Sequence, residues 1–147
     1  MRDYDVIIIG KGNAALCAAL SAREQGATVV MLETAPEEES GGNSRFAGGV
    51  MRFAFDSVED LKKLTDLTDA EIAESDFGTN TREEFLDKIY QLTSYRTDPD
   101  LSEYLVDESL EAMVWLRSKG VRFIPNWGRQ SAIVDGKRRF FGNMPIE

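Results

Sequence analysis

The sequence predicts an α/β protein that opens with a strand, a helix and a second strand parallel to the first. Short runs of β-branched and apolar residues at 5–9 and 28–32 are typical of strands buried on both faces of a parallel sheet. Between them, residues 13–25 are apolar on nearly every side and stop before Gly26, which indicates a buried helix with a glycine after its last turn. The order and lengths of these elements are those of a single βαβ unit.

A glycine-rich loop and several short helices are expected next. The loop spans residues 34–55. The helices are each opened by a Ser or Thr with an acidic residue three positions later, the pattern of a capping box. These patterns occur at Ser57 with Asp60, Thr68 with Glu71, and Thr81 with Glu84.

The longest helix is expected to begin at Asp98, with Pro99 as its first residue, and to end at Gly120. Residues 121–124 are expected to form a strand, and Asp135-Gly136 is typical of the tight turn of a hairpin. The helix carries an apolar stripe, which is expected to pack inward and is made of Leu101, Leu105, Ala112 and Leu116, widened by Tyr104 and Trp115.

Composition excludes several kinds of site. The chain has one cysteine and no histidine, so it can form neither an internal disulfide nor a Cys/His zinc site, and it lacks the thiolates for an iron–sulfur cluster. No metal site is expected. Cys17 falls within the predicted buried helix, where it is expected to act as a small apolar residue.

Charge is distributed unevenly along the chain. The net charge is −9 overall, with −12 in residues 56–116 and +5 in residues 117–147. The acidic middle argues against nucleic acid as a partner, because phosphate binding requires a basic surface. No apolar run is long enough to span a membrane, and acidic residues occupy the place of a signal peptide's positive charge. A cytoplasmic protein is therefore expected.

The segment between the first strand and the helix carries the chemistry. Its glycines, Gly10 and Gly12, and the small Ala15 match the pattern G-x-G-x-x-G/A. The first glycine permits a tight turn, the second lets the main chain approach a pyrophosphate, and Ala15 lets the helix pack on the sheet. The main-chain N–H groups of Asn13 and Ala14 then lie at the positive end of the helix dipole.

Glu33 follows the second strand, where a carboxylate can accept hydrogen bonds from the hydroxyl groups of a ribose. The strand, the glycine turn, the helix and Glu33 together predict a Rossmann-like site for the ADP half of a dinucleotide. These residues alone leave FAD and NAD open, because both contain that half. A non-catalytic module that binds NAD or ADP is therefore one alternative.

Beyond this pattern, the run Tyr4–Leu20, with Glu33 and the glycine-rich run Ser40–Gly49, resembles the flavoproteins of the fumarate reductase and succinate dehydrogenase family. The segments Gly12–Leu20 and Gly120–Phe123 resemble the tricarballylate dehydrogenase branch most closely. The resemblance implies the FAD-binding N-terminal part of a larger enzyme, of which this chain is an incomplete fragment.

The resemblance also implies further site residues and a reaction. The glycine-rich run would pass the pyrophosphate and ribityl chain of FAD, through Ser40, Gly41, Gly42, Asn43, Ser44, Gly48 and Gly49. FAD would be bound non-covalently, because the histidine that links it in some members is absent. The reaction would be hydride transfer between flavin N5 and a carbon of a small di- or tricarboxylate, with an electron-acceptor protein or a quinone-linked partner.

The catalytic residues would lie beyond residue 147, with Arg129 a candidate for binding the substrate carboxylate. Three segments follow from this reading. Residues 1–55 hold the βαβ unit and the FAD loop, residues 56–120 form a helical part of the FAD domain, and residues 121–147 begin a substrate-covering region. A flavoenzyme like the ketosteroid dehydrogenases, which share the Gly-Gly loop, is a second alternative.

Overall fold

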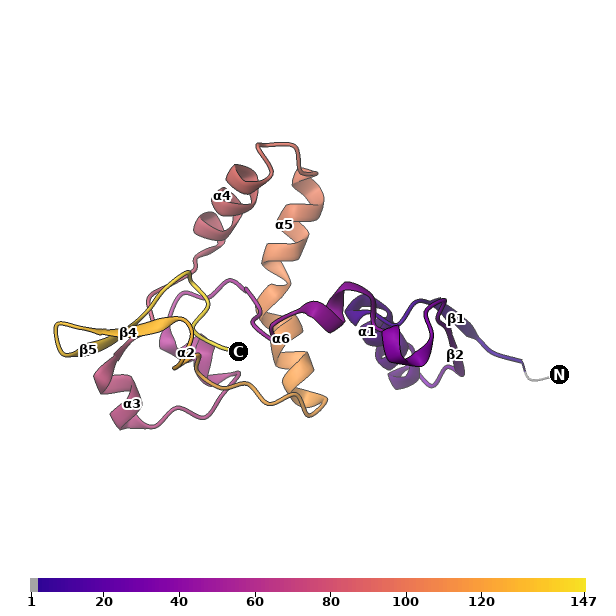
Figure 1. Cartoon of the computed structure of the whole chain (residues 1–147), viewed down its shortest axis with the longest axis horizontal. Helices are drawn as coiled ribbons and strands as arrows, with labels where there is room; N and C mark the ends of the chain where they lie inside the picture. The colour runs from indigo at the N-terminus through magenta and orange to yellow at the C-terminus, as the bar shows by residue number, and fades with distance from the viewer. Residues whose placement is uncertain (1–2) are drawn as a thin grey trace. The chain divides into compact units, whose positions relative to one another are not determined.

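The computed structural model describes residues 3–147, which fall into two compact units that meet in the sequence at Gly48 and Gly49 (Figure 1). We call them the N-terminal unit and the C-terminal unit. Both contain helices and strands, and both include a parallel strand pair, so the predicted α/β class is confirmed at this level. The functional division of the sequence at residues 55 and 120 stays a prediction.

The N-terminal unit is built from the expected strand, helix and strand. Strand β1 (Val6–Ile9) leads into helix α1 (Asn13–Glu24), and strand β2 (Val29–Leu32) returns parallel to β1. The register pairs Val6 with Val29 and continues to the pair Ile9 and Leu32. Both predicted strands and the predicted helix are therefore confirmed, with bounds that differ by one residue.

The expected burial of these elements is wrong for the described residues. Ile8 is buried, but Ile7 and Ile9 are 64% and 83% exposed, and α1 has no buried residue. Leu16 and Leu20 on α1 are about two-fifths exposed, and Cys17 is only half-buried. The reason is that this unit's sheet has two strands and that, within the described residues of the unit, it packs against α1 on one face.

Short 3₁₀ turns interrupt the glycine-rich loop. They are η1 (Glu37–Glu39) and η2 (Gly42–Phe46). Gly41, at the start of η2, has φ of +109°, a conformation that is costly for residues with a Cβ. The start of η2 therefore depends on a glycine at position 41.

The first helices of the C-terminal unit are α2 (Val58–Lys62) and α3 (Asp69–Glu74), and helix α4 (Arg82–Leu92) follows after a short strand. The capping boxes predicted at Thr68 and Thr81 are both formed. The one predicted at Ser57 is not, because the Ser57 side chain accepts no hydrogen bond from the helix; the Asp60 carboxylate accepts one from Asp56 N and pairs with Lys63.

The predicted long helix is divided into α5 (Pro99–Asp107) and α6 (Ser109–Ser118), which follow one another as a nearly continuous rod (Figure 1). Asp98 caps α5 through a hydrogen bond from Leu101 N, as predicted. The break is slight, because Glu108 N still bonds to Tyr104 O at 3.0 Å.

The expectation that the apolar stripe of this helix packs inward is wrong for its first part. Leu101, Tyr104 and Leu105 are all more than half exposed. The adjacent face, about 100° around the helix, is buried instead, through Ser102 and Val106 of α5 and Met113 of α6. The buried serine is accommodated because its hydroxyl donates a hydrogen bond to Asp98 O, at 2.7 Å.

A small sheet completes the unit in the order β3-β5-β4. Strands β4 (Ser131–Val134) and β5 (Lys137–Phe140) form the predicted hairpin. Asp135 and Gly136 both have positive φ at its turn, the conformation that favours this residue pair. Strand β3 (Ser75–Asp76) was not predicted; it is two residues long and pairs with β5 in parallel.

The strand predicted at residues 121–124 is also wrong. This segment is irregular, and its backbone pairs at one end only, where Ile124 and Glu147 exchange two hydrogen bonds of 2.8 Å. An isolated bridge links Pro125 with Ile146. A strand needs a partner along its length, and the described residues provide one only at this end.

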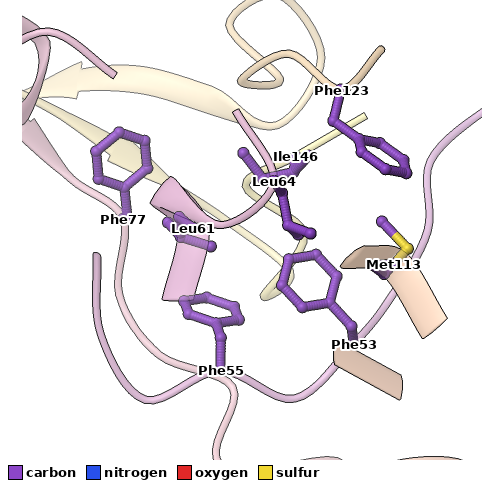
Figure 2. Close-up of a cluster of buried hydrophobic side chains, with 8 residues drawn as sticks. All are labelled: Phe53, Phe55, Leu61, Leu64, Phe77, Met113, Phe123 and Ile146. Atoms are coloured by element: carbon purple, nitrogen blue, oxygen red, sulfur yellow. The ribbon is translucent and has the colours of Figure 1, made fainter. Parts of the chain in front are cut away.

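The core of the C-terminal unit is a cluster of aromatic and aliphatic side chains from distant parts of the sequence (Figure 2). Asn80, fully buried, ties the segments together: its Nδ2 donates to Phe53 O, and its main chain pairs with Phe55. The members of the cluster are Phe53, Phe55, Leu61, Leu64, Phe77, Met113, Phe123 and Ile146.

Candidate functional site

The candidate site lies in the N-terminal unit, where β1 turns into α1. Gly10 has φ of +103°, and its N–H donates to Leu32 O at 2.7 Å, which fixes the turn against the end of β2. Gly12 is the N-cap of α1, and no side chain of its own caps the helix. The N–H groups of the first turn of a helix have no partner within it, so they point outward as donors for an anion.

The segment from Ser40 to Ser44 lies against this helix end. Asn13 N donates to Ser44 Oγ at 2.9 Å, and the Lys11 ammonium donates to Ser40 Oγ at 3.3 Å. A Cβ built on Gly12 would lie 3.6 Å from both Gly41 O and Ser44 Oγ. The glycine turn and the glycine-rich loop, separated by about 30 residues, thus form two sides of one cradle, which we call the glycine cradle.

Glu33 lies where its spacing predicts, just after β2 and beside the glycine turn. Its Oε1 accepts a hydrogen bond of 3.0 Å from Ala35 N. This bond lowers the pKa of Glu33 below its ordinary value, and the main-chain N–H groups of Gly41 and Lys11 act in the same direction. The carboxylate is therefore ionised at neutral pH and can accept hydrogen bonds from hydroxyl groups.

The structure brings most of the predicted residues together at the cradle and leaves two groups elsewhere. Gly48 and Gly49 lie where the two units meet in the sequence, beyond the turn η2. Arg129 belongs to the C-terminal unit, where its guanidinium lies 3.7 Å from the carboxylate of Glu147. Binding of the cofactor by Gly48 and Gly49, and of the substrate carboxylate by Arg129, stays a prediction.

Lys11 belongs to the cradle although it was absent from the predicted site residues. It occupies a variable position of the glycine pattern, so the pattern itself gives no role to its side chain. The signal available in the sequence was its charge, since an ammonium beside the turn is favourable for a pyrophosphate. Its hydrogen bond to Ser40 Oγ connects the turn with the loop.

Residues 3–147, the described part of the chain, contain neither a metal-binding cluster nor a membrane-spanning helix. No group of three or more His, Cys, Asp or Glu side chains in this part of the chain is arranged to hold a metal ion. None of the helices formed by these residues has the length and apolar character that crossing a membrane requires.

Comparison with known proteins agrees with this geometry. A vinyl phenol reductase of Lactiplantibacillus plantarum is 30% identical over 120 residues, which are 82% of this chain and 21% of that protein. A cytochrome fumarate reductase of Shewanella frigidimarina is 28% identical over 116 residues, 79% of this chain and 18% of that protein. A 3-oxosteroid 1-dehydrogenase of Mycolicibacterium smegmatis is 43% identical over 49 residues, a third of this chain and 8% of that protein.

The chain thus spans about a fifth of the length of the first two relatives. The model of the FAD binding domain family matches residues 5–140, which include the glycine cradle, Glu33 and most of the C-terminal unit. The predicted cofactor, FAD, is confirmed by this match. The chain belongs to the family of FAD binding domains found in oxidoreductases such as fumarate reductase.

Proposed function

We propose that this chain supplies the Rossmann-like site for the ADP half of FAD in a longer oxidoreductase. The observation that carries the proposal is the glycine cradle, in which two distant segments meet at the open N-terminus of α1 beside Glu33. The family match favours this reading over the alternative of a non-catalytic NAD or ADP module.

The cradle's parts have separate roles in this proposal. The N–H groups of Ala14 and Ala15 face the pyrophosphate, with the positive end of the helix dipole behind them, while Asn13 N donates to Ser44 Oγ and holds the glycine-rich loop at this helix end. Gly12 leaves room for that approach, because even one added carbon would lie in contact with Gly41 and Ser44. Glu33 accepts hydrogen bonds from the adenosine ribose.

The glycine-rich segment continues the site. In the proposal, its main chain runs from the pyrophosphate along the ribityl chain, and Lys11 adds a positive charge at the phosphate end. The residues assigned to this role are Ser40, Gly41, Gly42, Asn43 and Ser44, followed by Gly48 and Gly49. Because this chain contains no histidine, FAD is not linked covalently to it through a histidine.

For the complete enzyme, we propose dehydrogenation of a saturated carbon–carbon bond next to a carboxylate, or the reverse reduction, in a small di- or tricarboxylate. FAD would supply the hydride-accepting N5 atom, while this chain binds and orients the cofactor. The name of one relative supports this class, because fumarate is a dicarboxylate with a carbon–carbon double bond. Vinyl phenol also contains such a double bond, so the vinyl phenol reductase supports the type of bond but not the carboxylate. A succinate-, fumarate- or tricarballylate-like substrate fits the carboxylate class.

A steroid substrate is the second candidate, and it has one specific observation in its favour. The 3-oxosteroid 1-dehydrogenase has the higher identity, 43%, although over a third of the chain only. Because the full-length relatives are several times longer than this chain, the substrate pocket and the catalytic residues are assigned to further chain. An activity screen of the full-length gene product with fumarate, tricarballylate and a 3-oxosteroid distinguishes the two candidates.

The cofactor site itself is tested on the 147-residue chain by titration with FAD, ADP and NADP, followed by flavin fluorescence or calorimetry. Wild type should bind FAD and ADP, and should bind NADP more weakly because Glu33 repels a 2′-phosphate. Glu33→Ala should weaken FAD and ADP by about tenfold, the effect of one lost charge-assisted contact. Glu39→Ala, the same change at an exposed carboxylate on η1, is the matched control.

If the wild-type chain binds NADP with the same affinity as FAD, the proposed role of Glu33 is contradicted. Equal FAD binding by wild type and Glu33→Ala would do the same. The screen on the full-length product is separate: failure there with intact FAD binding would reject the substrate class and leave the cofactor site standing.

A further inference from the structure

Two half-buried cations in the C-terminal unit have no ion-pair partner. They are Arg52, which precedes the core residue Phe53, and Lys88, on α4. Within the part of the chain that the structure describes, neither side chain forms an ion pair. Removing a charge from water costs free energy, which an acidic partner usually offsets. For Arg52 and Lys88, no ion pair among the described residues offsets this cost.

Every other basic side chain of this unit is paired with an acidic side chain, stacked on a tryptophan ring or exposed. The two half-buried cations are therefore a distinct pair, which we call the cationic pair. The paired side chains are Lys62, Lys63, Arg82, Arg117, Arg129 and Arg139, the stacked ones are Lys119 and Arg138, and the exposed ones are Arg96, Arg122 and Lys137.

The buried amide of Asn80 connects the segments that carry the two cations. Lys88 Nζ lies 3.5 Å from Asn80 Oδ1, and Asn80 Nδ2 donates to the carbonyl oxygen of Phe53, the residue after Arg52. The Arg52 guanidinium is itself anchored, because its Nη2 donates to Gly142 O at 2.9 Å. Its remaining N–H groups have no partner among the described residues, so they are available as donors to a ligand.

The electrostatics of the cationic pair favour a bound anion. Burial lowers the pKa of the Lys88 ammonium below its ordinary value, and the positive charge of Arg52 acts in the same direction. The charge of Glu84 acts in the opposite direction, but its carboxylate already accepts hydrogen bonds from Thr81 N and the Thr79 hydroxyl. An anion bound by both cations would offset their desolvation and their mutual repulsion.

The position of Arg52 in the chain connects the pair with the cofactor. In the proposed function, Gly48 and Gly49 lie along the ribityl chain of FAD, which leads to the flavin ring. Arg52 follows Gly49 by three residues, so at most about 11 Å of backbone separates them. A cation at this distance from the ribityl stretch can reach a group of the substrate whose carbon exchanges hydride with the flavin.

We propose, on the basis of the proposed function, that Arg52 and Lys88 bind a carboxylate of the substrate in the longer enzyme. The Arg52 guanidinium presents planar donors to the carboxylate, and the Lys88 ammonium contributes a point charge. The pair is one carboxylate subsite of a pocket whose other residues are assigned to further chain. Binding at this subsite uses side chains of the C-terminal unit and requires no bound FAD.

The first experiment titrates the 147-residue chain, without FAD, with succinate and with succinamide, its neutral analogue. Binding is followed through the side-chain NMR signals of Arg52 and Lys88. Succinate should shift both signals and succinamide neither. Arg52→Gln and Lys88→Gln should each weaken succinate binding by about tenfold, the effect of one lost charge-assisted contact. Lys137→Gln, which removes the same charge from the exposed hairpin, is the matched control and should bind as wild type does.

A ligand site and a purely structural role predict opposite effects on stability. Without succinate, Lys88→Gln should melt at or above the temperature of wild type, because the change removes a half-buried charge that has no ion pair. In the full-length gene product, Arg52→Gln and Lys88→Gln should raise the KM for fumarate by about tenfold, while the FAD content stays that of wild type. Lys137→Gln should change neither quantity.

Three outcomes would overturn the proposal. One is a succinate titration that shifts neither signal, or that succinamide reproduces. Another is an equal loss of binding in Lys88→Gln and Lys137→Gln, since that would reflect net charge alone. The third is an unchanged KM in full-length Lys88→Gln together with a lower melting temperature, because the partner of the pair would then be a carboxylate of further chain.

These failures are distinguishable from failure of the proposed function. A wild-type chain that binds no FAD would reject the cofactor site, whereas the succinate titration is carried out without FAD and reports on the cationic pair alone. A full-length product that binds FAD but oxidises only a 3-oxosteroid would reject the carboxylate substrate, and the role of the pair with it.

Discussion

Replacing Gly12 by alanine and then by valine should weaken FAD binding in two steps while the fold is preserved. An alanine Cβ would lie 3.6 Å from Gly41 O and Ser44 Oγ. This is an ordinary contact, so the protein accepts it without movement. It nevertheless reduces the space that the pyrophosphate needs, and a modest loss of affinity follows.

The valine variant should have the larger effect. Its methyl groups extend about 1.5 Å beyond Cβ, so they must either displace the segment around Ser44 or occupy the phosphate position. Displacement breaks the hydrogen bond from Asn13 N to Ser44 Oγ, which is 2.9 Å long and worth about 0.5–1.5 kcal/mol. With the blocked phosphate contact, we expect a loss of about 1.4–2.8 kcal/mol, or about 10- to 100-fold in Kd.

The assay is a titration of the chain with FAD, together with thermal unfolding of each variant in the absence of ligand. Gly128→Val is the matched control, because Gly128 has no positive φ and no atom within 4 Å of its added Cβ. Binding of FAD by Gly12→Val with wild-type affinity, in a chain that unfolds normally, would refute the assignment of the cradle to the pyrophosphate.

Three further predictions concern the C-terminal unit and are checked by unfolding. Leu61→Ala, in the fully buried core, should lower the free energy of unfolding by about 2–5 kcal/mol in a denaturant titration; a smaller loss would contradict close packing there. Asn126→Leu should raise it by about 1 kcal/mol, because both polar atoms of this buried amide lack a partner among the described residues; a lower value would indicate that the amide is satisfied by bound water. The pKa of Glu71 is lowered by hydrogen bonds from the Thr68 main chain and hydroxyl, so its contribution should be present above about pH 4.3 and be lost as the pH falls through the lower pKa of the folded state. Measured as melting temperature against pH, Glu71→Gln should flatten this part of the profile, and an unchanged profile would exclude the capping carboxylate as its source.

Part of the candidate site could be predicted from the sequence because its determinants are local. The order of strand, glycine turn and helix places Gly10, Gly12 and Asn13 within one short segment. Glu33 follows from the same reasoning, because parallel strands place their carboxyl ends at one edge. The contacts of Ser40 and Ser44 with the turn are not local and became visible only in the structure.

The sequence by itself determined the βαβ unit, the caps at Thr68, Thr81 and Asp98, and the hairpin turn at Asp135. Each depends on residues within a few positions of one another, so the physical cause is contained in the local segment. The chemistry of the glycine pattern belongs to the same class, because the turn and the helix end are adjacent in the chain.

Only the tertiary structure decided which surfaces are buried and which strands pair. Periodicity marked Leu101 and Leu105 as an apolar stripe, yet packing against the rest of the unit buried Ser102 and Val106 instead. The pairing of β3 with β5 joins residues more than 60 positions apart, and residues 121–124 did not become a strand because a partner was present at one end only. A strand or a buried face exists only when a second segment supplies its hydrogen bonds or its cover, and no local pattern specifies that segment.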